Sequence, residues 1–119
     1  MIKAIAFTIY PVKDMAKARH FYEEILGLKP ALSVGDFWQE YDLGANTFGI
    51  VAVSDDMPEY FKRKSASIAF EVENLDEALA TLKGKGLNIV HGPADYPKCR
   101  MFIVSDLDDN MVTLHQLSK

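Results

Sequence analysis

Three residues are the candidates for proton transfer: Glu40, Glu71 and His115. A glutamate buried beside an aromatic ring such as Trp38 would have a raised pKa and could act as a general base. The alternatives are solvated carboxylates at the rim of a groove and a histidine with a structural role. Because these residues are far apart in the sequence, their chemistry depends on the elements that bring them to one surface.

A second candidate site near the C-terminus has the spacing of a calcium-binding loop. Asp106, Asp108 and Asn110 match the early ligands of such a loop. The sixth position, however, is Met111 and the twelfth is Leu117, where a glycine and a bidentate glutamate are needed. We therefore interpret the segment as a hairpin turn.

Length and composition indicate a single soluble domain. The chain has 119 residues, 49% hydrophobic content and a net charge of −4, which argues against a nucleic-acid partner. No apolar run approaches the roughly 20 residues of a membrane helix, and the N-terminus reads as a strand and not as a signal peptide, so we expect a cytoplasmic protein. Cys99 is the only cysteine, which excludes an internal disulfide and a CxxC motif.

The sequence repeats one pattern. "YPVKDMAKA" (10–18) and "EVENLDEAL" (71–79) both combine an apolar strand end, a polar turn and the start of a helix. Asp14 and Asn74 suit the N-caps of these helices, while Gly27 and Gly86 suit the left-handed position that follows a helix. Each helix has an apolar stripe for the core: Met15, Ala18, Tyr22, Ile25 and Leu26 in the first, and Leu75, Ala78, Leu79 and Leu82 in the second.

Each predicted helix is followed by a hairpin. Residues 36–53 and 99–117 alternate in polarity and are broken by "LGAN" and "DLDDN", which carry the residues that turns require. The predicted order of one strand, one helix and two or three strands occurs twice in the chain. The predicted modules cover about residues 1–56 and 65–119, with a linker at 57–64.

This tandem arrangement resembles the vicinal oxygen chelate superfamily, which includes glyoxalase I, extradiol dioxygenases and bleomycin resistance proteins. The resemblance spans the whole chain, and "YPVKDMAKARHFYEEILGLK" and "DLDDNMVTLHQL" match its signatures most closely. Asp109 replaces the usual glycine of the closing turn, which aspartate tolerates because it enters the left-handed region readily. The resemblance implies an α+β fold, in which two βαβββ modules form a curved mixed sheet around a concave cleft.

Metal-binding members of this family place ligands on the first and last strand of each module. The resemblance assigns these positions to Phe7, Gly49, Ser67 and Thr113, which are not a ligand set for a divalent transition metal. We therefore expect no metal and no cofactor. A shift of the alignment by two residues would instead bring in Glu71 or His115.

Strand alternation then predicts which side chains line the cleft, because residues two apart share a face. The predicted ligand-binding residues are Phe7, Ile9, Trp38, Glu40, Gly49, Ser67, Met101, Ile103 and Thr113, with Val51, Ala69, Glu71 and His115 on the same faces. Gly49 would leave room for a ligand or for the ring of Trp38. A mostly apolar lining with few ionisable groups is typical of a small-molecule site.

The favoured function is metal-independent binding of a small, partly aromatic or amphipathic molecule, as in resistance or sequestration. The alternatives are an enzyme that uses Glu40 or Glu71 with His115 for metal-free proton transfer, a metal-dependent lyase or dioxygenase, and a scaffold whose cleft is vestigial. The expected partners are a small molecule and a second copy of the chain in a homodimer, and no nucleic acid or membrane.

Overall fold

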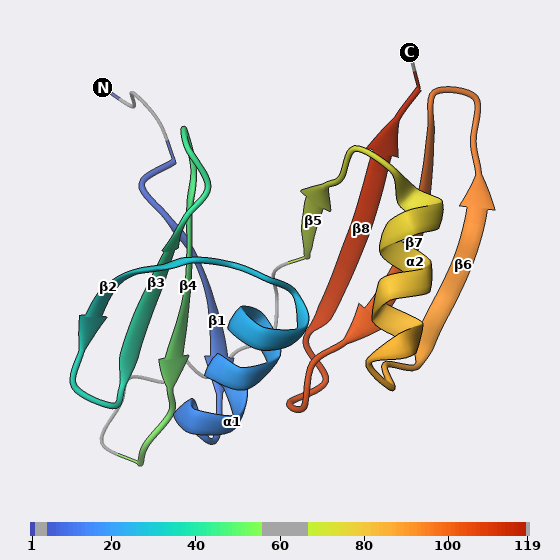
Figure 1. The fold of residues 1–119 in the computed structure, drawn as a ribbon. Helices are drawn as coiled ribbons and strands as arrows, with labels where there is room; N and C mark the ends of the chain where they lie inside the picture. The colour runs from blue at the N-terminus through green and yellow to red at the C-terminus, as the bar shows by residue number, and fades with distance from the viewer. Residues whose placement is uncertain (2–4, 56–66, 119) are drawn as a thin grey trace. The chain divides into compact units, whose positions relative to one another are not determined.

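The chain forms two compact units, Met1–Ser65 and Ala66–Lys119, in a computed structural model that describes residues 1, 5–55 and 67–118. Each unit contains one four-stranded mixed sheet with a helix on one face (Figure 1). Both follow the order of one strand, a helix and three strands, which confirms the predicted α+β class. The predicted linker at 57–64 lies outside the described residues.

The first unit is built around a sheet with the strand order β1-β4-β3-β2. Its strands are β1 (Thr8–Val12), β2 (Pro30–Val34), β3 (Trp38–Asp42) and β4 (Thr47–Ala52), and its helical segment comprises α1 (Met15–Arg19) and the π-helical turn η1 (His20–Ile25). Strand β1 pairs in parallel with β4, whereas β3 pairs antiparallel with both β2 and β4.

The second unit repeats this topology with the strand order β5-β8-β7-β6. It contains β5 (Ile68–Glu71), α2 (Leu75–Gly84), β6 (Ile89–Asp95), β7 (Cys99–Ser105) and β8 (Met111–Leu117). Strand β5 pairs in parallel with β8, and the other neighbours are antiparallel. No helix among the described residues is long and apolar enough to cross a membrane.

The predicted caps and exits of the helices are confirmed. The side chain of Asp14 accepts a hydrogen bond from the Lys17 backbone N–H at 3.1 Å, and Asn74 accepts one from Glu77 at 3.0 Å. These bonds satisfy N–H groups that a helix leaves without a partner in its first turn. Gly27 and Gly86 both have φ of 79°, the left-handed conformation that a side chain would strain.

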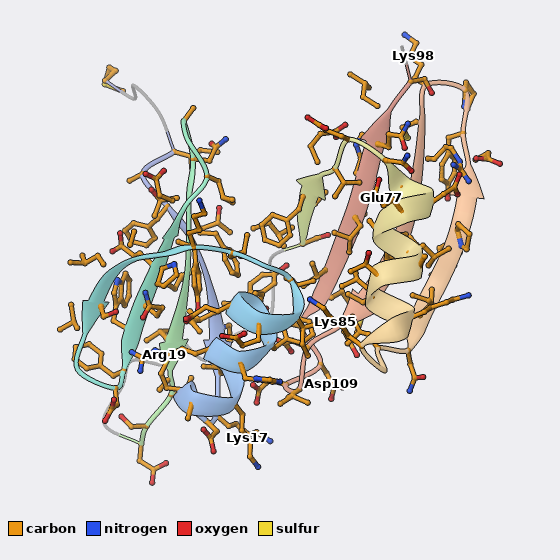
Figure 2. The ribbon with its side chains drawn as sticks, in the orientation of Figure 1. Lys17, Arg19, Glu77, Lys85, Lys98 and Asp109 are labelled. Atoms are coloured by element: carbon orange, nitrogen blue, oxygen red, sulfur yellow. The ribbon has the colours of Figure 1, made fainter. Side chains whose placement is uncertain are left out.

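The turn between β7 and β8 is a hairpin turn, as predicted. Asp106 is buried, and its carboxylate accepts hydrogen bonds from the backbone N–H groups of Asp108 and Asn110 and from the Asn110 side chain. Asp109 has φ of 62° at the tip of this turn (Figure 2), which confirms the left-handed conformation expected there. The Asp106 carboxylate therefore organises the loop backbone.

The first helix departs from regular geometry, and this changes its core face. The Leu26 N–H bonds to the Phe21 carbonyl oxygen, a five-residue step that widens the turn. As a result Phe21 and Tyr22 are both buried, while Ile25 is only half-buried. The predicted stripe omitted Phe21 because it assumed a uniform period of 3.6 residues.

The space beside Gly49 is filled, which contradicts the prediction of room for a ligand or for Trp38. Ile9 and Gly49 are register partners in the β1–β4 pair. A Cβ atom added to Gly49 would lie 2.6 Å from the δ1 methyl of Ile9 and 3.2 Å from the Gln39 carbonyl oxygen. Glycine at position 49 therefore accommodates the side chain of its neighbouring strand.

This packing predicts a specific energetic coupling between the two residues. Gly49→Ala should lower the free energy of unfolding by about 1–3 kcal/mol, because the new methyl group overpacks the contact. Ile9→Val removes the δ1 methyl group, so in that background the same substitution should cost clearly less. A double-mutant cycle measured by urea denaturation gives the coupling free energy. A coupling close to zero would contradict the assigned contact.

Candidate functional site

Each sheet has a face opposite its own helix, here called the helix-free face. In the first unit Tyr10, Tyr41 and Phe48 lie on the helix side, where they are buried and their rings contact one another or Tyr22. Alternation places the predicted residues of this unit on the helix-free face: Phe7, Ile9, Trp38, Glu40, Gly49 and Val51. Glu40 pairs with Gly49, as predicted.

Three of these residues form a polar and aromatic cluster. The indole Nε1–H of Trp38 donates a hydrogen bond to Oε2 of Glu40 at 2.7 Å. The rings of Phe7 and Trp38 meet edge to face, with their centroids 5.5 Å apart, and Phe7 is 45% exposed. The half-buried Trp38 and Glu40 thus present an aromatic surface beside a carboxylate whose position is fixed.

The opposite side of the first sheet holds β3 in position. Gln39 is buried, and its Oε1 accepts hydrogen bonds from Arg19 Nε and the Ser33 hydroxyl, while its Nε2 donates to the carbonyl oxygens of Leu32 and Glu40. Arg19, which Figure 2 labels on the helical segment, also donates a hydrogen bond to the carbonyl oxygen of Gly35. Because Gln39 lies between Trp38 and Glu40, this network fixes the strand from which both side chains project.

Tyr41 adds a further hydrogen bond between β3 and the helical segment. Its hydroxyl donates to Oε2 of Glu23 at 2.9 Å, and burial together with this carboxylate raises the pKa of Tyr41 far above its ordinary range. The phenol therefore stays protonated and remains a hydrogen-bond donor to the helix.

The helix-free face of the second sheet carries a carboxylate–imidazole pair. Nδ1 of His115 lies 2.6 Å from Oε1 of Glu71, and the backbone N–H of Leu117 donates to Oε2 of Glu71 at 2.7 Å. The two side chains are register partners on β8 and β5. Sequence reasoning named both residues, and the parallel pairing of their strands brings them together.

The environment of Glu71 differs from the buried site considered from the sequence. Its side chain is 57% exposed. The hydrogen bond from the Leu117 N–H, followed by the one from His115, holds the pKa of the Glu71 carboxyl below its ordinary value of 4.5. Glu71 is therefore an ionised carboxylate that orients its neighbours. It lacks the raised pKa expected of a buried general base.

The other predicted residues of this unit surround the pair. Met101 pairs with His115, while Ile103 and Ala69 both pair with Thr113. His91 also belongs to this face, because it pairs with Ile103, and it was missed by the sequence analysis. Strand β6 has two register shifts around His91, so its sequence shows no regular alternation.

The predicted acid–base set is divided between the units. Glu71 and His115 meet in the second unit, whereas Glu40 belongs to the first and bonds to Trp38. Of the remaining predicted residues, Ser67 precedes β5 and is exposed.

The residues at the family's metal positions do not fit a metal. Phe7 packs against Trp38, Gly49 has no side chain, and Ser67 and Thr113 offer only neutral hydroxyl groups. Divalent transition metals bind such groups weakly without imidazole or carboxylate ligands. Within residues 5–55 and 67–118, no three His, Cys, Asp or Glu side chains are grouped to hold a metal ion.

Comparisons with known proteins agree with this fold. The structure resembles that of TnmS3, an antibiotic binding protein from Streptomyces sp. CB03234, with 25% identity, a TM-score of 0.80 and 98% of each chain covered. A glyoxalase/bleomycin resistance protein from the same organism has 25% identity and a TM-score of 0.75, with 95% of this chain and 100% of that chain covered.

A lactoylglutathione lyase from Agrobacterium tumefaciens shares the fold alone, at 16% identity and a TM-score of 0.80, with 97% of this chain and 94% of that chain covered. No curated protein matches the chain significantly. The family model of the Glyoxalase/Bleomycin resistance protein/Dioxygenase superfamily matches residues 4–114. The chain therefore belongs to this superfamily.

Proposed function

We propose that the protein binds a small, partly aromatic or amphipathic molecule without a metal, as a resistance or sequestration protein does. The observation that carries this proposal is the cluster of Phe7, Trp38 and Glu40 on the helix-free face of the first sheet. It combines aromatic surface with a fixed hydrogen-bond acceptor, the combination by which small-molecule sites orient a ligand.

The cluster favours a planar ligand that carries a cation or a hydrogen-bond donor. Oε2 of Glu40 accepts the indole N–H of Trp38, which leaves Oε1 as the acceptor for a ligand. An aromatic contact contributes about 0.5–1.5 kcal/mol, and a hydrogen bond to a charged group contributes about 1.5–3 kcal/mol. The similarity to an antibiotic binding protein at 25% identity supports a small-molecule ligand.

We do not propose metal-dependent lyase or dioxygenase chemistry, because the donor set at the family's metal positions does not fit a metal. We expect the purified protein to carry no stoichiometric metal. Elemental analysis after dialysis without a chelator measures this. About one zinc, iron, nickel or manganese ion per chain, lost in Glu71→Ala or His115→Ala, would show that the ligand positions were assigned incorrectly.

We also propose a cytoplasmic homodimer. Strand β2 and the following turn expose Leu32, Val34 and Phe37, an apolar edge that suits a symmetric contact. Light scattering at micromolar concentration should give about twice the chain mass of 13.3 kDa. A mass equal to that of one chain would contradict the dimer.

The ligand proposal is tested through Trp38, the only tryptophan in the chain. The cationic planar amine 9-aminoacridine and the neutral planar phenazine should both change its emission. Glu40→Gln should weaken 9-aminoacridine binding about tenfold or more, because a charge-assisted bond is lost, and should leave phenazine binding nearly unchanged.

The matched control is Glu77→Gln, which makes the same charge change at an exposed position in α2 (Figure 2). This variant should bind both compounds like the unmodified protein. Unchanged emission with both compounds, or equal losses in the two variants, would count against the Phe7, Trp38 and Glu40 site.

A further inference from the structure

We propose that Nε2 of His115 forms a second binding site, on the helix-free face of the second sheet, that accepts a hydrogen bond from an acidic hydroxyl group of the phenol or enol class. This site goes beyond the proposed function, since it uses different residues in the other unit. Its parts are the Glu71–His115 pair and the apolar side chains beside it.

The position of the imidazole proton follows from the bonds to Glu71. An ionised carboxylate only accepts hydrogen bonds, so the Nδ1 atom at 2.6 Å from Oε1 must carry a proton. In the neutral imidazole ring the other nitrogen, Nε2, is then an acceptor. The lowered pKa of Glu71 supports the ionised form of the carboxylate.

Nε2 is available to a ligand within the part of the chain that the structure describes. The hydrogen bond of the His115 ring there is made by Nδ1, and the side chain is 24% exposed. Because Glu71 already orients the ring and the side chain is partly exposed, the binding of a donor at Nε2 requires little reorganisation of the protein.

The surroundings select the chemical class of the ligand. Ala94, Met101 and His115 are successive register partners, and Ile103 and Thr113 form the next row. Aliphatic groups and a thioether favour an apolar or aromatic body, with which sulfur makes favourable contacts. The titratable groups on this face are Glu71 on β5, His91 on β6, Cys99 on β7 and His115 on β8.

Anionic ligands are disfavoured at this site. The four strands β5–β8 contain one Arg or Lys residue, Arg100, and its guanidinium bonds Asp76 of α2 and Asp95. Because Glu71 already adds a negative charge to the helix-free face, a carboxylate or phosphate would be repelled. A neutral hydroxyl group meets no such repulsion and supplies the proton that Nε2 accepts.

The Glu71→Gln variant should remove the acceptor while preserving the shape of the pair. The Leu117 N–H must still be accepted, so it bonds the amide oxygen of the new side chain. The amide NH₂ group then faces Nδ1 and donates to it, which moves the ring proton to Nε2. The site would thereby change from an acceptor into a donor.

The test compares phenol with anisole, its methyl ether, by calorimetric titration at about pH 8.5, which lies well above the ordinary histidine pKa of about 6.5 and below the phenol pKa of about 10. The unmodified protein should bind the phenol at least tenfold more tightly than the ether. Glu71→Gln and His115→Phe should abolish this preference, and the control His20→Phe, at an exposed position in the first unit, should keep it. Circular dichroism verifies that each variant is folded.

Nitrogen-15 NMR gives a second readout that does not depend on a probe. The neutral ring of His115 should carry its proton on Nδ1 in the unmodified protein and on Nε2 in Glu71→Gln. A proton on Nε2 in the unmodified protein, or equal affinity for the two probes, including no measurable affinity for either, would overturn the proposal. A negative result for the His115 site would not change the result expected from the Trp38 and Glu40 experiment, because the two sets of variants lie in separate units.

Discussion

The parallel pairing of the first and last strands of each unit is the constraint on which both candidate sites depend. It places Ile9 beside Gly49 and Glu71 beside His115, although each pair is about 40 residues apart in sequence. A parallel pair needs a crossover connection, and here α1 and α2 lie within these connections and cover one face of each sheet (Figure 1). The candidate site residues, including Glu40, Glu71 and His115, therefore lie on the opposite, helix-free faces.

Hydrogen bonds on the helix side of the first sheet fix the position of the side chains on its helix-free face. Gln39 and Tyr41 are polar groups in a buried layer, and their hydrogen bonds reach Arg19 and Glu23 on the helical segment. Buried polar groups are costly unless they are paired, so this network strongly favours one register of β3. A shift by one residue would turn Trp38 and Glu40 toward the helix.

Sequence patterns were sufficient for the element order, the helix caps and the faces of most strands, because these depend on local chemistry and on a period of two. They failed where packing departs from a regular period. Phe21 is buried by a π-helical turn, and His91 follows a bulge. The space beside Gly49 could not be judged from position 49 alone, because a side chain from another strand, that of Ile9, fills it.

In both units a glutamate carboxylate on the helix-free face accepts hydrogen bonds from neighbouring groups, but the donors differ. In the first unit, a neighbouring indole N–H occupies one oxygen of Glu40, and the other oxygen is the acceptor of the proposed site for a cation or hydrogen-bond donor. In the second, a backbone N–H and an imidazole occupy both oxygens of Glu71, so the acceptor role passes to Nε2 of His115. In the neutral ring that atom is the acceptor for the proposed hydroxyl ligand. Repetition of one module thus gives two faces whose proposed ligand preferences differ because different donors bind the two carboxylates.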